Sequence, residues 1–172
     1  MNSFMNRIQK RDTAILMLFN NSIRCKAFNL IMPILTYIGS SVFAILFCIA
    51  TFFDAFTRTL SIKTSSALII SSIIVRIIKI SVNRLRPYLI LQNLNTRKIG
   101  IDNYSFPSGH TTCAFCIAVM LSLNLPSLTL VSILIASFVG VSRMYLGVHY
   151  PTDVFVGSLI GSATSIIIFG LF

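Results

Sequence analysis

Residues 60–82, "LSIKTSSALIISSIIVRIIKISV", form a mostly apolar run of 23 residues. About 20 residues of α-helix are enough to cross the hydrocarbon core of a bilayer, so this run predicts a transmembrane helix. Hydrophobic residues make up 55% of the 172-residue chain, and its mean hydropathy is +0.87. A soluble domain of this size could not bury so much apolar surface. The sequence therefore predicts one all-α membrane domain over residues 1–172.

Four more apolar segments flank this run: residues 28–53, 110–123, 127–146 and 151–172. Together they predict a polytopic protein with five transmembrane helices, each near the length that a bilayer requires. Gly39, Ser40 and Ser41 interrupt the first segment and are expected to bend it. An additional crossing near residues 28–40 would raise the count to six.

The N-terminal segment, residues 1–21, has an apolar core that is too short for a span. Its apolar residues share one helical face, and Arg7, Lys10 and Arg11 lie between them. This pattern is typical of a helix that lies in the membrane interface. We therefore expect an interfacial helix to precede the spans.

The formal net charge of the chain is +10. In a soluble protein this excess of cations would favour nucleic acid, but Arg76 and Lys79 lie within an apolar run that no duplex could reach. An anionic membrane surface or a phosphorylated substrate is the better partner for these charges. The four cysteines predict neither a disulfide framework nor a zinc site, because no second pair or histidine cluster accompanies Cys113 and Cys116.

The order of the predicted spans places three polar clusters on one side of the membrane. The connections after residues 60–82 and after residues 127–146 are separated by two crossings, so they lie on the same face. Residues 79–87, 107–110 and 143–153 are therefore expected to converge.

The first cluster contains two cations, Lys79 and Arg86, that are seven residues apart. On a continuing helix that Pro87 ends, they would lie on one face and could hold a dianion near the helix end. The alternative is that they are anchors whose side chains extend to the interface, which is common at span ends. Arg76 and Arg84 are interpreted as such anchors.

In the second cluster, Pro107, Ser108 and Gly109 are expected to open a helix. The first N–H groups of a helix have no partner within it and can bind phosphate, and Gly109 lets a ligand approach the backbone. His110 would then be placed to deliver a proton. A serine cap without any ligand is the alternative for Ser108.

In the third cluster, Asp153 lies in the first turn of the last predicted helix and can reach His149 just before it. A carboxylate partner fixes the tautomer of an imidazole and makes its other nitrogen more nucleophilic, although such a pair can also be purely structural. Arg143 adds a third cation. Taken together, the clusters favour phosphoryl transfer, in which His149 attacks phosphorus, Asp153 supports the imidazolium and His110 protonates the leaving oxygen.

Metal catalysis is disfavoured, because two-metal phosphatases need several carboxylates. The chain has four acidic residues, all Asp. Asp12 and Asp54 lie far from the three clusters in the sequence, which leaves Asp153 and Asp102 near them. We therefore expect a metal-independent enzyme without a cofactor.

These motifs resemble the three signatures of the type 2 phosphatidic acid phosphatase (PAP2) superfamily: Lys79-x6-Arg86-Pro87, Pro107-Ser108-Gly109-His110 and Ser142-Arg143-x5-His149-x3-Asp153. The resemblance covers residues 79–153 and implies the helical membrane core of the family. It also implies a phosphohistidine intermediate on His149, with Asp153 orienting that residue and His110 acting as the acid. The phosphate ligands that it implies are Lys79, Arg86, Ser108, Gly109 and Arg143.

Membrane members of this family remove phosphate from lipids or isoprenoid carriers, and the predicted spans exclude its soluble haloperoxidase branch. Undecaprenyl diphosphate, phosphatidylglycerophosphate, phosphatidic acid and the lipid A phosphates all stay open as substrates. The resemblance implies a multi-pass protein of the cell membrane with its site on the outer face. The cations of the N-terminal arm favour the cytoplasmic face instead under the positive-inside rule.

Two further alternatives concern function and assembly. A non-enzymatic transporter or anion-binding protein is the competing function, but its polar residues would be expected in the middle of the spans. Gly157, Gly161 and Ser165 form a stripe of small residues in register with Asp153. This stripe either packs within the bundle or makes a homodimer contact.

Overall fold

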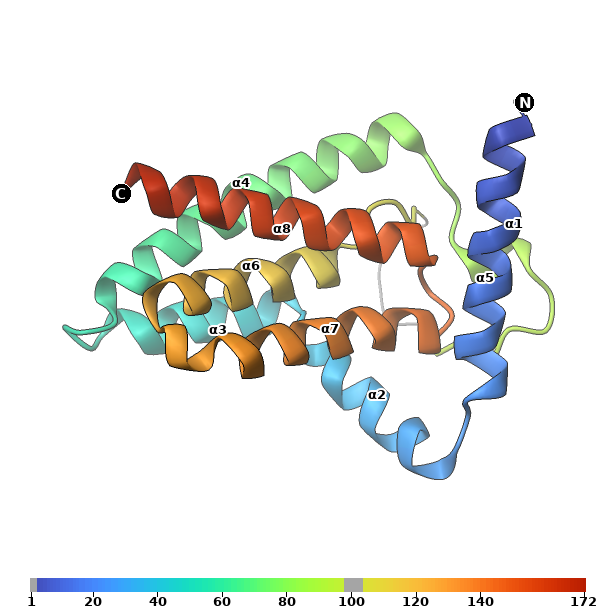
Figure 1. Cartoon of the computed structure of the whole chain (residues 1–172), viewed down its shortest axis with the longest axis horizontal. Coiled ribbons are helices and arrows are strands. Elements are labelled where there is room, and N and C mark those ends of the chain that lie inside the picture. The colour runs from blue at the N-terminus through green and yellow to red at the C-terminus, as the bar shows by residue number, and fades with distance from the viewer. Residues whose placement is uncertain (1–2, 98–103) are drawn as a thin grey trace.

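A computed structural model describes residues 3–97 and 104–172, and within these ranges the chain forms helices and short connections without a strand (Figure 1). The helices are α1 (Ser3–Met17), η1 (Leu18–Ser22), α2 (Lys26–Ile38), α3 (Ser41–Phe52), α4 (Arg58–Val82), α5 (Pro87–Ile90), α6 (Gly109–Asn124), η2 (Pro126–Leu128), α7 (Thr129–Tyr145) and α8 (Pro151–Leu171). The predicted all-α architecture is confirmed.

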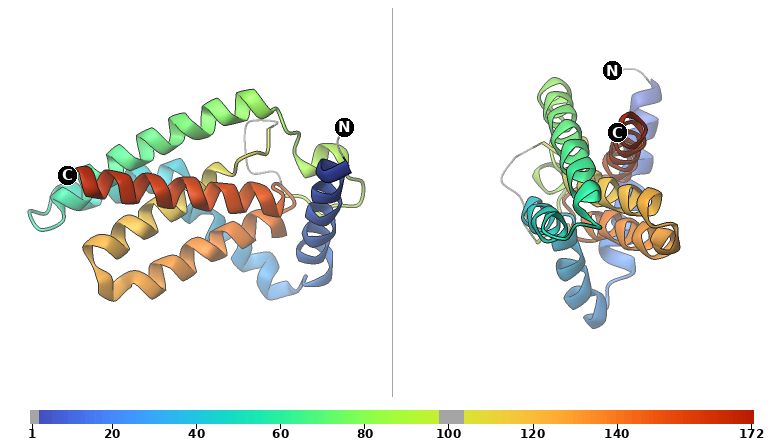
Figure 2. Two further views of the ribbon diagram at one scale, coloured as in Figure 1. Left: turned by 45° about the horizontal axis from the view of Figure 1, so that its top comes forward. Right: turned by 90° about the vertical axis from the view of Figure 1, so that its left-hand side faces the viewer.

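The bundle is built around α6, which packs against α4, α7 and α8. Figures 1 and 2 show these helices running lengthwise beside one another, with α3 next to α4. The side chains that α6 buries are mostly small, among them Thr112, Ala114, Cys116 and Ala118. Small side chains let neighbouring helices approach closely, which suits association in lipid.

The stripe of small residues on α8 faces α6. A Cβ atom on Gly157 would come within 2.7 Å of the carbonyl oxygen of Ser108, and one on Gly161 would overlap the carbonyl oxygen of Thr112. Ser165 is buried and donates a hydrogen bond from Oγ to the Cys116 carbonyl at 2.9 Å. The stripe therefore packs within the bundle, whereas a homodimer stays a prediction.

Gly161→Ala is expected to lower the free energy of unfolding by about 1–3 kcal/mol, because the added methyl group meets backbone that cannot rotate away. Gly170→Ala on the same helix is the matched control, since a Cβ there meets nothing within 4 Å. Thermal unfolding of both variants in detergent measures the difference. Equal midpoints would contradict the close α6–α8 contact.

Three helices are long and apolar enough to cross a membrane: Arg58–Val82, Pro126–Tyr145 and Pro151–Leu171. The pair α2 and α3 adds a fourth if it is one broken span, bent by 56° where Gly39 and Ser40 interrupt it. The expected bend is thus confirmed, whereas the described residues give three or four candidate spans in place of five or six. The number of candidate spans is lower than predicted because α6 has only 16 residues and because α2 and α3 together make no more than one passage.

Helix α1 lies across one end of the bundle, beside the start of α8 and roughly at right angles to the long helices (Figures 1 and 2). Its inner face buries Asp12 and Leu16, while Arg7 and Lys10 are exposed. This placement agrees with the predicted interfacial helix. It also brings α1 to the end of the bundle where the polar clusters meet.

Candidate active site

The three polar clusters converge as the order of the helices requires. The C-terminal ends of α4 and α7 and the N-terminal ends of α6 and α8 meet at the end of the bundle that α1 crosses (Figure 1). Lys79, Arg86, Gly109, His110 and His149 all line one cavity of about 920 Å³. Five of the eight predicted site residues therefore share this cavity.

His149 lies in the connection between α7 and α8 and is almost completely buried. Gly147 makes the turn that ends α7, with a left-handed φ of +69° that glycine adopts at little cost. The Nδ1 atom of His149 lies 3.5 Å from Asp153 Oδ2. That distance is slightly longer than a hydrogen bond, and it places the carboxylate where it can pair with the imidazole.

The Nε2 atom of His149 lies 3.4 Å from Arg86 Nη1. A guanidinium has donors only, so this contact requires a lone pair on Nε2 and leaves the proton on Nδ1, toward Asp153. Burial, followed by the charges of Arg143, Arg86 and Lys79, lowers the pKa of His149 well below its usual value. The imidazole is therefore neutral at neutral pH, and both His149 and Arg86 line the cavity.

Asp153 is held from two sides in the first turn of α8. Its Oδ2 accepts a hydrogen bond from the Tyr150 N–H at 2.7 Å, and its Oδ1 accepts one from Arg84 Nη1 at 2.7 Å. Pro151 begins the helix, as expected for a residue whose missing N–H costs nothing there. The carboxylate is thereby fixed beside His149.

The three predicted cations approach the same region from different elements. Arg86 Nη1 also donates to the carbonyl of Val148, and Lys79 Nζ donates to the carbonyl of Tyr104 at 3.1 Å. Arg143 is completely buried at the end of α7 and donates from Nη1 to Thr36 Oγ1 at 2.7 Å. Thr36, on α2, is a site residue that the sequence did not indicate.

Ser108 caps α6. Its Oγ accepts a hydrogen bond from the Thr111 N–H at 3.4 Å and lies 2.9 Å from Thr111 Oγ1. Its own N–H donates to the carbonyl of Asp153 at 3.0 Å. In this structure the Ser108 hydroxyl therefore serves the helix start, while Gly109 and His110 present the first turn to the cavity.

Two expectations about the first cluster are wrong. Helix α4 ends at Val82, because Asn83 adopts a left-handed conformation with a φ of 51°. Pro87 does not end that helix but begins the short α5, with Arg86 as its N-cap. Lys79 and Arg86 still reach one cavity, but they do so from two separate elements.

Arg84 is not a membrane anchor, and Asp12 does not lie apart from the site. Arg84 forms ion pairs with Asp12 at 2.6 Å and with Asp153 at 2.7 Å. Asp12 is buried, whereas Asp54 lies at the turn before α4, at the opposite end of that helix. The only sequence signal for Asp12 is that it is an isolated acid on a basic helix.

Asp102 lies outside the described residues. Within residues 3–97 and 104–172, no group of three or more His, Cys, Asp or Glu side chains is placed to hold a metal ion. Metal independence stays a prediction, with its test given below.

The sequence model of the PAP2 superfamily matches residues 60–172 of this protein, which is more than half of the chain and includes all three clusters. The chain belongs to the PAP2 superfamily. It is 33% identical over 113 residues to the bacitracin transport permease protein BcrC of Bacillus licheniformis, covering 65% of this chain and 55% of that protein. It is also 33% identical over 107 residues to an undecaprenyl-diphosphatase of Sulfolobus acidocaldarius, covering 62% of this chain and 52% of that protein.

The chain thus spans about half the length of these two PAP2 relatives. Its fold extends further, since it matches the crystal structure of a transmembrane PAP2 type phosphatidylglycerolphosphate phosphatase from Bacillus subtilis. The TM-score is 0.81 at 28% identity, over 96% of this chain and 86% of that structure. The PAP2 fold therefore includes the helices that precede residue 60.

Proposed function

We propose that this PAP2 protein is an integral-membrane phosphatase that removes a phosphate group from a lipid or isoprenoid phosphate through a phosphohistidine on His149. The observation that carries the proposal is the His149 imidazole, neutral and paired with Asp153, at a cavity that also holds His110, Arg86 and Lys79. Each of these groups has a distinct part in phosphoryl transfer.

In the first step, Nε2 of His149 attacks phosphorus and the bond to the leaving oxygen breaks. Lys79, Arg86 and Arg143 neutralise charge on the equatorial oxygens, with the Gly109 N–H at the start of α6 as an additional ligand. Ser108 supports this turn as its cap, because its own N–H is bonded to the Asp153 carbonyl. His110 donates a proton to the leaving oxygen. In the second step, water gives a proton to His110 and attacks the phosphohistidine, which releases inorganic phosphate and restores both histidines.

The shape of the cavity favours a lipid substrate. Its polar end holds the two histidines, and its remainder runs between α3 and α4 along Ile45, Ile49 and Ile69. These three side chains are exposed on the outside of the bundle, where lipid would lie. The lining of α4 extends from Ser65 to Lys79, which is about 21 Å of helix. A lipid phosphate can thus enter sideways, with its chain in the groove.

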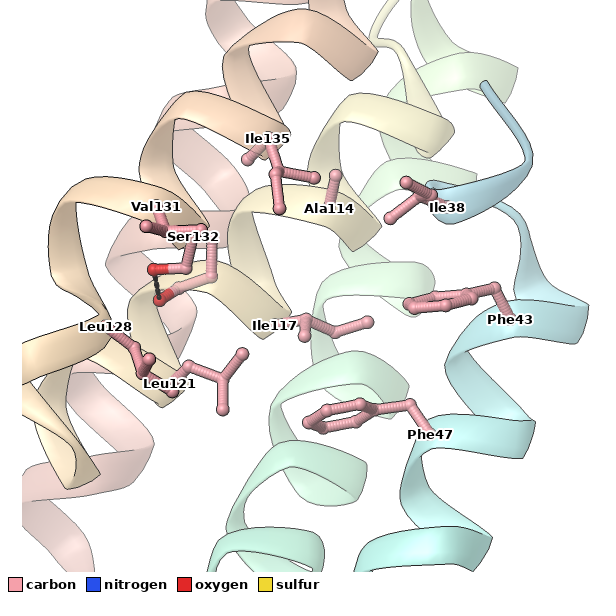
Figure 3. Close-up of a pocket in the computed structure, with 12 residues that line it drawn as sticks. Ile38, Phe43, Phe47, Ala114, Ile117, Leu121, Leu128, Val131, Ser132 and Ile135 are labelled. Atoms are coloured by element: carbon pink, nitrogen blue, oxygen red, sulfur yellow. Dashed lines mark hydrogen bonds between the residues drawn. The ribbon is translucent and has the colours of Figure 1, made fainter. Parts of the chain in front are cut away.

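A second pocket, of about 170 Å³, lies between α3, α6 and α7 and is lined by apolar side chains and Ser132 (Figure 3). None of the residues that line it is ionisable. Its chemistry is that of a lipid-facing surface and offers nothing to a phosphate. The larger cavity is therefore the substrate site in this proposal.

Undecaprenyl diphosphate and phospholipid or lipid A phosphates are the proposed substrates. The names of an undecaprenyl-diphosphatase and a phosphatidylglycerolphosphate phosphatase among the similar proteins support this class. Arg76, one turn before Lys79, also lines the groove. It gives the site a further cation for substrates with a second phosphate.

Purified protein in detergent is expected to release inorganic phosphate from these lipids, and to keep its activity in excess EDTA, because cations of the chain do the work of a metal. Phosphate release from a substrate panel, with and without the chelator, measures both. A complete loss that Mg²⁺ restores would contradict the cation site. No release from any lipid phosphate would favour the non-enzymatic transporter or anion-binding alternative.

We also propose five crossings of the cell membrane, with α6 as a short central span, and an active site on the outer face. In this proposal α2 and α3 make one passage, so α1 shares the face of the site, and the cations of α1 act against this orientation. Cys25 is exposed at that same end, before α2. A membrane-impermeant maleimide is expected to label Cys25 on intact cells and to lose that label in Cys25→Ser. Labelling only after lysis would place the site inside.

A further inference from the structure

The guanidinium of Arg84 connects the N-terminal helix to the partner of His149. Its Nη1 donates to Asp153 Oδ1 at 2.7 Å, and its Nη2 donates to Asp12 Oδ2 at 2.6 Å. It also lies 4.0 Å from the centre of the Tyr150 ring. The side chains of Asp153 and Asp12 are buried, and that of Arg84 is 18% exposed. The two ion pairs are thus largely shielded from water. Removal of one partner from such a pair is costly, because it leaves the other charge buried without compensation.

Asp12 also contacts α8 directly. Its Oδ1 accepts a hydrogen bond from the Thr152 N–H at 3.2 Å, and its Oδ2 accepts one from the Thr152 hydroxyl. Thr152 is the second residue of α8, so a carboxylate from α1 satisfies an N–H group that the helix leaves without a partner. Helix α1 therefore fixes both the cation that holds Asp153 and the backbone turn that carries it.

This arrangement has a chemical consequence for Asp153. Its Oδ2 faces His149, while its Oδ1 is held by Arg84. A guanidinium with a single carboxylate would direct its whole charge at Asp153 and draw that carboxylate away from the imidazole. With Asp12 on its other edge, Arg84 shares its charge between two carboxylates and keeps a fixed orientation.

We infer that Asp12 and Arg84 are positioning residues, which hold Asp153 in the geometry in which it supports His149 as nucleophile. Helix α1 is then part of the catalytic unit as well as an interfacial element. Neither side chain is among the described residues that line the cavity, so both act through Asp153 and not on the substrate. The inference rests on the proposed phosphatase function.

The test is a set of Asp12 and Arg84 variants in purified protein, with phosphate release from one lipid phosphate as the readout. Asp12→Asn is expected to lower kcat by about 10–100-fold, as loss of a supporting contact typically does. KM is expected to change by less than about twofold, because the cavity is untouched. Asp12→Glu, which keeps the charge and both acceptor oxygens, should retain most of kcat.

The decisive measurement is Asp12→Asn in an Asp153→Asn background. There the additional loss should be less than about twofold, because Asp12 acts through a carboxylate that is already gone. If Asp12→Asn does not fold, Arg84→Lys takes its place, since an ammonium cannot present two donor edges. Asp54→Asn is the matched control and should match the parent, because the Asp54 carboxylate accepts hydrogen bonds from Thr57 at the far end of α4, away from the site.

Three results would overturn the inference: an undiminished kcat in Asp12→Asn, a rise in KM alone, or the same fold loss in both backgrounds. The parent protein in the same assay separates these results from failure of the proposed function. An active parent with any of the three outcomes removes only the positioning role. An inactive parent overturns the phosphatase proposal and this inference with it.

Discussion

His149→Ala is expected to abolish turnover, with a loss in kcat on the order of 10⁶-fold, the scale seen when a covalent nucleophile is removed from a hydrolase. The reason is that His149 lines the cavity and that its Nε2 atom, which carries the lone pair, lies 3.4 Å from Nη1 of Arg86. No other group is expected to take over attack on phosphorus, since the Ser108 hydroxyl is engaged in capping α6. Steady-state phosphate release from lipid substrate measures the loss.

The intermediate itself gives an independent measurement. Brief reaction of the parent protein with labelled substrate, followed by a rapid quench, should place acid-labile phosphate on His149. The His149→Ala variant, shown to be folded by its thermal transition, is the control and should carry no label. Label on Ser108, or no label at any quench time, would count against covalent catalysis through His149.

Asp153→Asn extends this prediction to the partner of the nucleophile. The amide keeps the size of the carboxylate, and its single oxygen can keep one of the two hydrogen bonds, from Arg84 or from the Tyr150 N–H, so the fold should survive. It cannot balance the charge of the imidazolium or hold the same tautomer, a defect that costs about 10⁴-fold in kcat in a serine protease triad. A loss of that order in a variant that still unfolds in one cooperative thermal transition is the expected result.

The sequence predicted the convergence of the site because the signals for it lie in short stretches of the chain. Each signature is short, and the order of the spans places the ends of α4, α6, α7 and α8 together whatever the details of packing. The bend at Gly39 followed from the same kind of signal. Only the structure shows why a glycine is needed there. A Cβ atom on Gly39 would lie 2.6 Å from the carbonyl oxygen of His110, so a larger residue would prevent this close contact with α6.

The contacts that the sequence did not predict are those between distant segments. Arg84 and Asp12 are 72 residues apart, and Arg143 and Thr36 are 107 residues apart. Helical spacing carries no information about such pairs, and the basic pattern of α1 favoured an interfacial role for all of its polar residues. The end of α4 at Asn83 was not predicted for another reason. Asparagine tolerates the left-handed conformation that ends the helix but does not require it, so the residue type alone does not indicate the end.

The role of His110 can be separated from that of His149 by the chemistry of the leaving group. His110 is the second residue of α6 and lines the same cavity as His149, which lies in the connection between α7 and α8. A monophosphate lipid expels an alkoxide, which is a poor leaving group and needs a proton in the transition state. A diphosphate lipid expels a phosphate monoester, which leaves readily without one. General acid catalysis therefore matters most for the first class.

His110→Ala is accordingly expected to lower kcat/KM for phosphatidic acid by about 10²–10⁴-fold, the usual contribution of a positioned acid. The loss should be much smaller for undecaprenyl diphosphate and for p-nitrophenyl phosphate, whose leaving groups are more acidic. In the proposed mechanism all three substrates place the same phosphate against Lys79, Arg86 and Arg143, so a defect in binding or folding would affect them equally. Measuring kcat/KM of parent and variant on the three substrates therefore distinguishes the roles. An equal loss on all three would mean that His110 positions phosphate or supports the start of α6, and that the leaving oxygen takes its proton from another source.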